Sequence, residues 1–244
     1  MKKALLAKLQ AARVQKQSAV LVTDLTTGDQ RLFTGQDQYG DLMLNPEVMT
    51  EIDRMRSDDR SRAIATGGDD DHRLFIHVYN PPKQLIIVGA VHIAQSLAPM
   101  AALAGYDVTV VDPRGTFATD QRFPGVALAE EWPDEALVKL APDRRTAVVT
   151  LTHDPKLDDP ALNAALASEA FYIGALGSRR THGQRLERLR EAGRSEEELT
   201  RIHGPVGLNI GSVSPAEIAV SILGQMTQTL HMPAPHMPTP EPAA

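Results

Sequence analysis

From Gln84 onward the sequence alternates short apolar runs with amphipathic stretches, and this alternation leaves few folds open. Continuous apolar runs are typical of strands that are covered on both faces, whereas the intervening stretches have helical spacing. Regular alternation of this kind predicts a parallel sheet with helices on both faces, that is, a Rossmann-like doubly wound α/β fold. The expected strands are 85–89, 107–112, 125–129, 146–152 and 171–178.

Capping signals indicate where several of the helices begin and end. Gly105 is a typical helix stop, and Ser195 with Glu198 and Ser214 with Glu217 have the spacing of capping boxes. The expected helices of this half are 93–104, 134–141, 160–168, 179–193, 195–203 and 214–226.

Residues 1–80 mix helical and strand-like segments with turns and lack the regular alternation, which predicts a smaller N-terminal α+β domain. An amphipathic helix is expected first, with Leu5, Leu6, Leu9 and Ala12 on one face. Further elements are strands at 18–25, 31–35, 62–67 and 72–80, an acidic turn at 67–71, and a helix at 46–57 that Asn45 caps. Paired prolines at 81–82 mark a boundary before the second domain at 84–230, and the proline-rich residues 231–244 are expected to form a disordered tail.

Bulk properties exclude several classes of function. The 244 residues carry a formal net charge of −6 and no long basic run, which argues against nucleic acid as a main partner. Cysteine is absent, so disulfides, thiolate metal sites and a cysteine nucleophile are excluded. No window has the roughly 18 apolar residues of a membrane span, and charged residues interrupt the N-terminal apolar stretch. We therefore expect a cytoplasmic protein with no membrane partner.

The turn after the first strand of the second domain resembles a dinucleotide-binding fingerprint with one departure. Gly89 and Ala94 fill the first and third glycine roles, but Val91 occupies the second, where a branched side chain would crowd a pyrophosphate. Asp112 ends the second strand, where an acid usually accepts ribose hydroxyls. Taken alone, the motif is equally compatible with a tight turn, with Asp112 as a strand-end cap and His92 as an exposed helix residue.

Polar and glycine-rich loops follow the expected strands, and the carboxyl ends of parallel strands share one edge of the sheet. Arginines in these loops favour a ligand that carries phosphate. The candidate cofactor-binding residues are Gly89, Ala90, His92, Asp112, Arg114, Arg122, His153, Gly177, Ser178, Arg179, Asn209 and Gly211. No catalytic residue and no metal site is predicted, because neither a Gly-x-Ser-x-Gly turn nor ligands at metal-binding spacing are found.

Four segments in order, 88–125, 148–158, 171–193 and 202–222, carry a family resemblance. They include VGAVHIA, LTHDPKLD, GALGSRRTHG and GLNIGSVSPAEIAVSI. The stretch from Gln84 to Met226 resembles the XdhC/CoxI family, accessory proteins of xanthine dehydrogenase and related molybdenum hydroxylases. The resemblance implies a C-terminal Rossmann-like domain joined to a separate N-terminal domain.

The resemblance also implies a function. A non-catalytic chaperone would bind molybdenum cofactor, as molybdopterin or its dinucleotide form, and assist maturation of a xanthine dehydrogenase or CO dehydrogenase-type hydroxylase. The implied partners are the apo hydroxylase and a cofactor sulfurase, and the scaffold is compatible with a homodimer. This chain departs from the family at Val91, where the usual loop reads Gly-Ala-Gly-His-Val-Ala. It also lacks the Ser-Gly-Gly-Cys-Val-Glu type of segment, so a thiol-dependent role is excluded.

Two alternatives remain open at this point. The first is an NAD(P)-dependent oxidoreductase that uses the same domain, for which Asp112 favours NAD over NADP. The second is a scaffolding or regulatory paralogue whose site is vestigial, an interpretation that the missing thiol favours.

Overall fold

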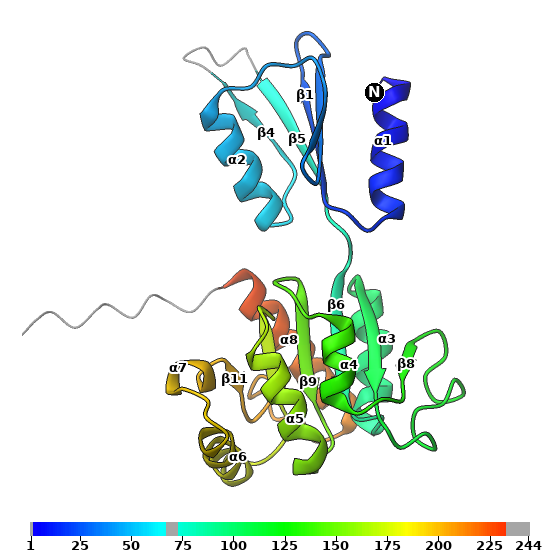
Figure 1. The fold of residues 1–244 in the computed structure, drawn as a ribbon, viewed down its shortest axis with the longest axis vertical. Coiled ribbons are helices and arrows are strands. Elements are labelled where there is room, and N and C mark those ends of the chain that lie inside the picture. The colour runs from blue at the N-terminus through cyan, green and yellow to red at the C-terminus, as the bar shows by residue number, and fades with distance from the viewer. Residues whose placement is uncertain (1, 67–72, 233–244) are drawn as a thin grey trace, which may run out of the picture. The chain divides into compact units, whose positions relative to one another are not determined.

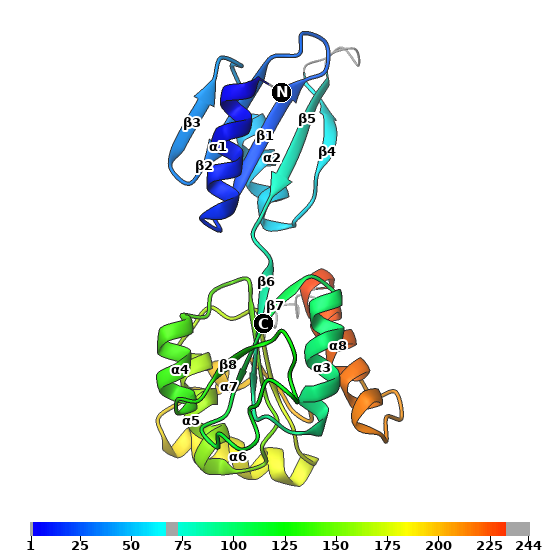
Figure 2. The ribbon, with the colours of Figure 1, turned by 90° about the vertical axis from the view of Figure 1, so that its right-hand side faces the viewer.

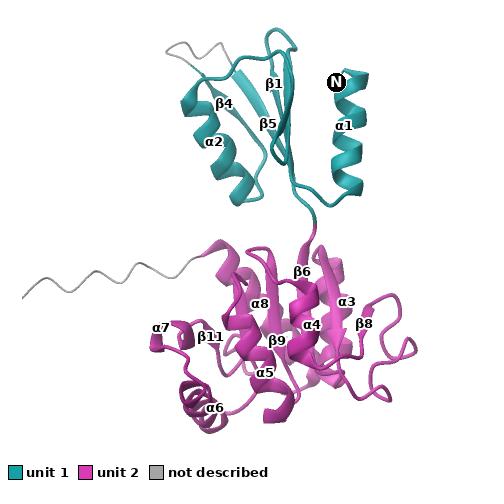
Figure 3. Ribbon diagram, in the orientation of Figure 1, with its two compact units in different colours: residues 1–81 teal, residues 82–244 magenta. Residues whose placement is uncertain are grey.

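The computed structural model describes residues 2–66 and 73–232. The chain divides into two compact units, an N-terminal unit, Met1–Pro81, and a C-terminal unit, Pro82–Ala244 (Figure 3). The acidic turn expected at 67–71 lies outside the described residues, as does most of the tail expected at 231–244.

The N-terminal unit is an antiparallel sheet with one helix on each face (Figure 1). Its strands are β1 (Ala19–Asp24), β2 (Gln30–Thr34), β3 (Asp37–Gly40), β4 (Arg62–Ala65) and β5 (Arg73–Tyr79), in the order β3-β2-β1-β5-β4. Side chains alternate along the central strand β1: Ala19 and Leu21 pack with α1 (Lys3–Val14), and Val20 and Val22 pack with α2 (Pro46–Ser57).

Local signals set most of these bounds. The Asn45 side chain accepts a hydrogen bond from the Val48 N–H at 2.9 Å, which confirms the predicted cap of α2. In α1, Leu5 and Leu9 are buried but Leu6 is 38% exposed, so its predicted place on the buried face is wrong. Leu6 follows Leu5 directly, and a helix turns each successive residue by about 100° away from the buried stripe.

The C-terminal unit is built on a six-stranded parallel sheet, which confirms the predicted fold class. Its strands are β6 (Lys83–Val88), β7 (Tyr106–Val111), β8 (Ala127–Ala129), β9 (Thr146–Thr150), β10 (Tyr172–Ala175) and β11 (Ile202–His203), in the order β11-β10-β9-β6-β7-β8. The strand order reverses between β6 and β9, as in other Rossmann-like sheets. The helix predicted at 195–203 ends at Leu199, and its last residues form β11 instead.

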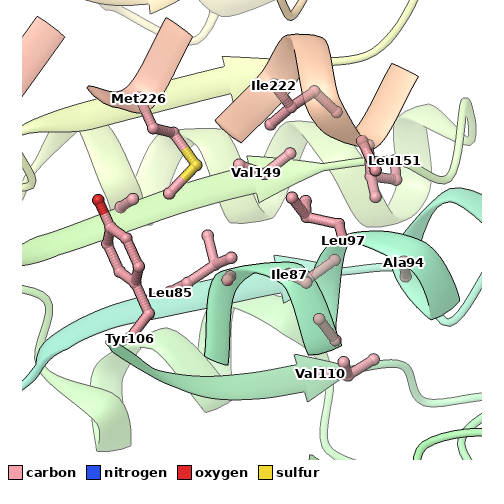
Figure 4. Close-up of a cluster of buried hydrophobic side chains, with 14 of the residues drawn as sticks. Leu85, Ile87, Ala94, Leu97, Tyr106, Val110, Val149, Leu151, Ile222 and Met226 are labelled. Atoms are coloured by element: carbon pink, nitrogen blue, oxygen red, sulfur yellow. The ribbon is translucent and has the colours of Figure 1, made fainter. Parts of the chain in front are cut away.

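Helices cover both faces of this sheet (Figure 2). They are α3 (His92–Leu103), α4 (Pro133–Leu140), α5 (Pro155–Leu166), α6 (Arg179–Glu191), α7 (Glu196–Leu199) and α8 (Pro215–His231). The helices α3 and α8 pack against one face, where Leu85 and Ile87 of β6 meet Leu97, Ile222 and Met226 (Figure 4). The helices α4, α5 and α6 pack against the other face.

One crossover of this unit lacks a helix, and its last helix is longer than the sequence predicted. The crossover from β7 to β8, residues 112–126, contains no α-helix, although most parallel strands are joined through one. The last helix, α8, continues to His231, five residues beyond its predicted end at Met226 and one residue into the expected tail.

Candidate functional site

The carboxyl ends of the parallel strands bring four loops to one edge of the C-terminal unit. These loops follow β6, β7, β9 and β10, and the strand order reverses between β6 and β9, the strands that precede the first and third of them. Ligands of open α/β sheets bind at this position.

Gly89 begins the first of these loops, and its backbone requires glycine. Its φ angle is +110°, and a Cβ atom at this position would lie 2.7 Å from Cγ2 of Thr152. Val91, in contrast, has φ −93° and ψ 175°, an extended conformation that any residue adopts, and its side chain packs against the buried cluster beneath α3. The backbone therefore needs a glycine at the first fingerprint position and does not need one at the second.

Asp112 ties the loop after β7 to the loop after β6. Its carboxylate accepts hydrogen bonds from the Ala90 N–H at 2.8 Å and from the Arg114 N–H at 3.0 Å. The Arg114 guanidinium donates two more, from Nε at 2.9 Å and from Nη2 at 2.8 Å. Four donors match the number of lone pairs on a carboxylate, so Asp112 is fully occupied by the protein.

Electrostatics keep this pair charged. Burial alone would raise the pKa of Asp112, but the hydrogen bonds from Arg114 and Ala90 outweigh burial and lower the pKa below its usual range. The Asp112 carboxylate raises the pKa of Arg114 in turn, and Asp154 and Asp158 add to the effect. The Arg114 side chain is 40% exposed and lies over the Phe117 ring at 4.7 Å, and its Nη1 group donates no hydrogen bond to the described residues. Arg114 can therefore present a fixed guanidinium edge to an anion.

A series of buried polar contacts connects two of the loops. The Thr152 hydroxyl donates to Oδ1 of Asp158 at 2.6 Å, and Oδ2 of Asp158 lies 3.7 Å from Nη2 of Arg185. That Nη2 donates to the Leu176 carbonyl at 2.7 Å, directly before Gly177. The side chains of Asp158 and Arg185 are each only 2% exposed. These polar contacts thus link α5 and α6 to the loops that contain Thr152 and Gly177.

This buried pair is incompletely satisfied. Oδ2 of Asp158, and Nε and Nη1 of Arg185, make no hydrogen bond with the described residues. Burial raises the pKa of Asp158 despite its hydrogen bond from Thr152, and burial lowers the pKa of Arg185. Neither Asp158 nor Arg185 is among the site residues predicted from the sequence. The available signal was spacing: Arg185 precedes the buried Leu189 by four residues, which places both on one helix face.

The helix N-termini at this edge differ in capping. Asp154 caps α5 through the Lys156 N–H at 3.0 Å, and Ser178 caps α6 through the Thr181 N–H at 3.1 Å. The N-cap of α3 is Val91, which offers no side-chain hydrogen bond, and the first turn of α3 contains no acidic residue. The first N–H groups of α3 therefore remain available, together with the positive end of the helix dipole.

The predicted site residues fall into separate groups. Hydrogen bonds join Asp112 to Ala90 and Arg114, Gly89 directly precedes Ala90, and exposed His92 begins α3 beside them. His153 is exposed with φ +60° and acts electrostatically on Asp158.

The other predicted residues lie at different points. Gly177, Ser178 and Arg179 form the start of α6, where a Cβ on Gly177 would lie 3.6 Å from Nη2 of Arg185. Arg122 instead bonds to Gln95 and the Phe117 carbonyl. Asn209 and Gly211 are exposed in the loop before α8.

Comparison with known proteins places this unit among relatives. The family model described as the XdhC Rossmann domain matches residues 85–226, which confirms the resemblance seen in the sequence. The molybdenum cofactor insertion chaperone PaoD of Escherichia coli is 36% identical over 61% of this chain and 40% of its own length. A Bacillus subtilis protein named as a probable xanthine dehydrogenase subunit is 32% identical over 66% of this chain and 47% of its own length. The chain thus spans less than half of either relative.

A solved structure shares the fold of nearly the whole chain. The protein described as a xanthine dehydrogenase (BH1974) from Bacillus halodurans superposes with a TM-score of 0.72 at 24% identity. The match covers 96% of this chain and 66% of that one. At this level of identity the likeness establishes the shared fold.

Proposed function

Because the chain belongs to the XdhC family through its Rossmann domain, we propose that it is an accessory protein that binds molybdenum cofactor and assists the maturation of a molybdenum hydroxylase. One relative is named for molybdenum cofactor insertion and another for its place in xanthine dehydrogenase. In this role the cofactor is cargo, so the protein needs groups that hold and release it and needs no catalytic residue.

The observation that supports the proposal best is the uncapped N-terminus of α3 beside the fixed Arg114. Molybdopterin carries a phosphate, and its dinucleotide form carries a pyrophosphate. Free N–H groups at a helix start bind such anions, and an oriented guanidinium adds charge-assisted hydrogen bonds. Asp112 holds Arg114 in place through two side-chain bonds, which reduces the ordering required when the anion binds.

The chemistry of the chain restricts how it holds the cargo. With no cysteine in the sequence, a thiolate cannot bind the molybdenum or its sulfur. Among residues 2–66 and 73–232, no three His, Asp or Glu side chains gather into a metal-binding group. The protein's contribution therefore falls on the phosphate end of the cofactor, where Arg114 and α3 lie.

The NAD(P)-dependent alternative is less well supported by the same geometry. An acid that binds ribose hydroxyls needs free lone pairs, whereas Asp112 already accepts four hydrogen bonds from Ala90 and Arg114. Ribose binding would have to displace Arg114 from a buried carboxylate. Calorimetry with NAD tests this alternative, which fails if no heat of binding is seen at millimolar ligand.

The proposal is tested by binding and by partner transfer. Protein from a molybdate-fed host is analysed by native mass spectrometry for bound pterin, and affinity for purified cofactor and for inorganic pyrophosphate is measured by calorimetry. Arg114→Gln should weaken both affinities about 10-fold or more, since one charge-assisted bond contributes about 1.5–3 kcal/mol.

The matched control is Arg144→Gln, at an 81% exposed arginine that precedes β9 at the opposite edge of the sheet. The control should bind like the wild type. Absence of bound pterin together with absence of affinity for added cofactor would remove the proposal. A cofactor-loaded protein that activates no apo hydroxylase would remove the maturation role.

The described residues contain no helix long and apolar enough to cross a membrane. The cytoplasmic location expected from the sequence, the cofactor sulfurase as partner and the homodimer stay predictions. Fractionation of the native host and size-exclusion chromatography with light scattering would test the location and the oligomeric state respectively.

A further inference from the structure

A second concave surface lies outside the loops described above, along the flank of α3. We call it the α3 groove, a hollow of about 560 Å³ between α3 and the end of the β7–β8 crossover. Its lining residues are Gln95, Pro99, Ala102 and Leu103 of α3 with Arg122, Phe123, Pro124, Gly125 and Val126. The groove exists because residues 112–126 cross to β8 without a helix that would pack beside α3.

The size and walls of the groove suit a small organic ligand. Ligand pockets typically measure about 300–1,000 Å³ and are mostly apolar with a few polar groups. Pro99, Leu103 and Pro124 supply apolar surface, and the Leu103 side chain is 91% exposed. A ring placed against these side chains would remove apolar surface from water.

Hydrogen-bonding groups are present in the same groove. Pro99 has no N–H, so the helix cannot give the Gln95 carbonyl its usual partner four residues later. The Gln95 side-chain oxygen accepts a bond from Nη2 of Arg122 at 3.2 Å. Because Gln95 lines the groove, its backbone carbonyl and its side-chain amide are the candidate partners for the polar edge of a ring.

Arg122 gives the groove a positive charge without a counterion. Its Nη1 donates to the Phe117 carbonyl at 2.7 Å, and its guanidinium lies over the rings of Phe117 and Phe123 at 5.9 and 5.6 Å. No carboxylate among residues 2–66 and 73–232 pairs with Arg122. Two of its five N–H donors are used, which leaves three for an anion.

We propose that the α3 groove binds a planar aminopyrimidinone ring that carries an anionic group. The apolar walls hold the ring, the Gln95 carbonyl accepts from its N–H edge, and Arg122 pairs with the anion. The inference rests on the proposed function, since the pterin and a nucleobase of the dinucleotide form share this ring. Gln95, the fourth residue of α3, lies at the end of the groove nearest the phosphate site proposed above, and Ala102 and Leu103 line the other end.

The test uses the full-length protein and two ring probes, 6-carboxypterin and CMP, with ribose 5-phosphate as the probe that lacks a ring. Ala102→Trp fills the groove from an exposed helix position, and Arg122→Gln removes the charge. Val138→Trp, on α4 at a 77% exposed position on the other face of the sheet, is the matched control. Circular dichroism confirms that each variant is folded.

We expect a ring probe to bind the wild type and the control equally, and to bind at least 10-fold more weakly to both groove variants. Tighter binding of 6-carboxypterin assigns the groove to the pterin, and tighter binding of CMP assigns it to the nucleobase. The inference is overturned if neither ring probe binds at millimolar concentration, if ribose 5-phosphate binds as well as they do, or if Ala102→Trp binds normally.

Inorganic pyrophosphate separates this inference from the proposed function. The groove variants should retain wild-type affinity for pyrophosphate, because it binds at the start of α3 and at Arg114. Pyrophosphate binding without ring binding refutes the groove alone. Ring binding without pyrophosphate binding refutes the proposed phosphate site and leaves the groove in place.

Discussion

Replacing Gly89 with alanine should destabilise the C-terminal unit through two separable effects. The first is backbone strain, because φ is +110° and a side chain in such a conformation costs about 1–3 kcal/mol. The second is overlap, because the new Cβ would lie 2.7 Å from Cγ2 of Thr152, and forcing an extra carbon into a packed site costs about 1–3 kcal/mol. Together they predict a loss of about 2–6 kcal/mol, a large share of the usual 5–15 kcal/mol.

Thr152→Ser separates the two effects. Serine keeps the hydroxyl that donates to Asp158 and accepts from the Asp154 N–H, and it removes the methyl group that the new Cβ would strike. In the Gly89→Ala background this second change should therefore restore about 1–3 kcal/mol and leave the backbone part unrelieved. In the wild-type background, losing one methyl group should cost about 1 kcal/mol.

The assay is urea unfolding followed by tryptophan fluorescence. Trp132 is the single tryptophan of the chain, and it lies at the start of α4, so its signal reports on the C-terminal unit alone. The wild type, the two single variants and the double variant are compared with one common slope of unfolding free energy against urea concentration. The reasoning is refuted if Gly89→Ala unfolds within about 0.5 kcal/mol of wild type, or if Thr152→Ser adds its own loss without any rescue.

Three further substitutions probe other contacts by the same urea assay. Asp112→Asn should destabilise the protein at pH 7. Since the pKa of Asp112 is lower in the folded than in the unfolded state, its stabilising contribution is present above about pH 4 and is lost as the pH falls further. An equal difference in unfolding free energy between wild type and variant at pH 3 and pH 7 would contradict this. Arg185→Met should lower the unfolding free energy by about 3–5 kcal/mol because it leaves the buried Asp158 carboxylate without its ion-pair partner. The Asp158→Asn/Arg185→Met double variant should recover part of that loss, and a double variant less stable than the single one would oppose this view. Glu217→Ala should remove about 1 kcal/mol by breaking the capping box of α8, while Glu217→Gln should retain most of it, and equal losses would count against the cap.

Much of the fold was predictable because its signals are local. Continuous apolar runs identified the parallel strands, and Asn45 before Pro46 placed the start of α2 at the observed residue. The strands β3 and β11 were missed for opposite reasons. β3, Asp37–Gly40, is a polar edge strand without an apolar pattern, and β11 is two residues long directly after a short helix.

The site was predicted less completely, since loop membership does not fix side-chain direction. The sequence placed Asp112 and Arg114 after the same strand, but their mutual hydrogen bonds depend on how the loop turns back. Arg122 follows the same strand and nevertheless lies over Phe117, along the flank of α3. The spacing of Arg185 from Leu189 indicates one shared helix face, but the ion pair of Arg185 with Asp158 depends on α5 packing against α6, which no local pattern records.

The parallel sheet of the C-terminal unit ends in very short strands on both sides, β8 with three residues and β11 with two. An added strand from another protein would need a longer row of unpaired N–H and C=O groups than either border offers. β-augmentation is thus a poor route to complex formation for this unit. A protein that binds this unit has to contact the side chains of its helices and loops. Specificity for a partner would then be set by these side chains and not by main-chain pairing.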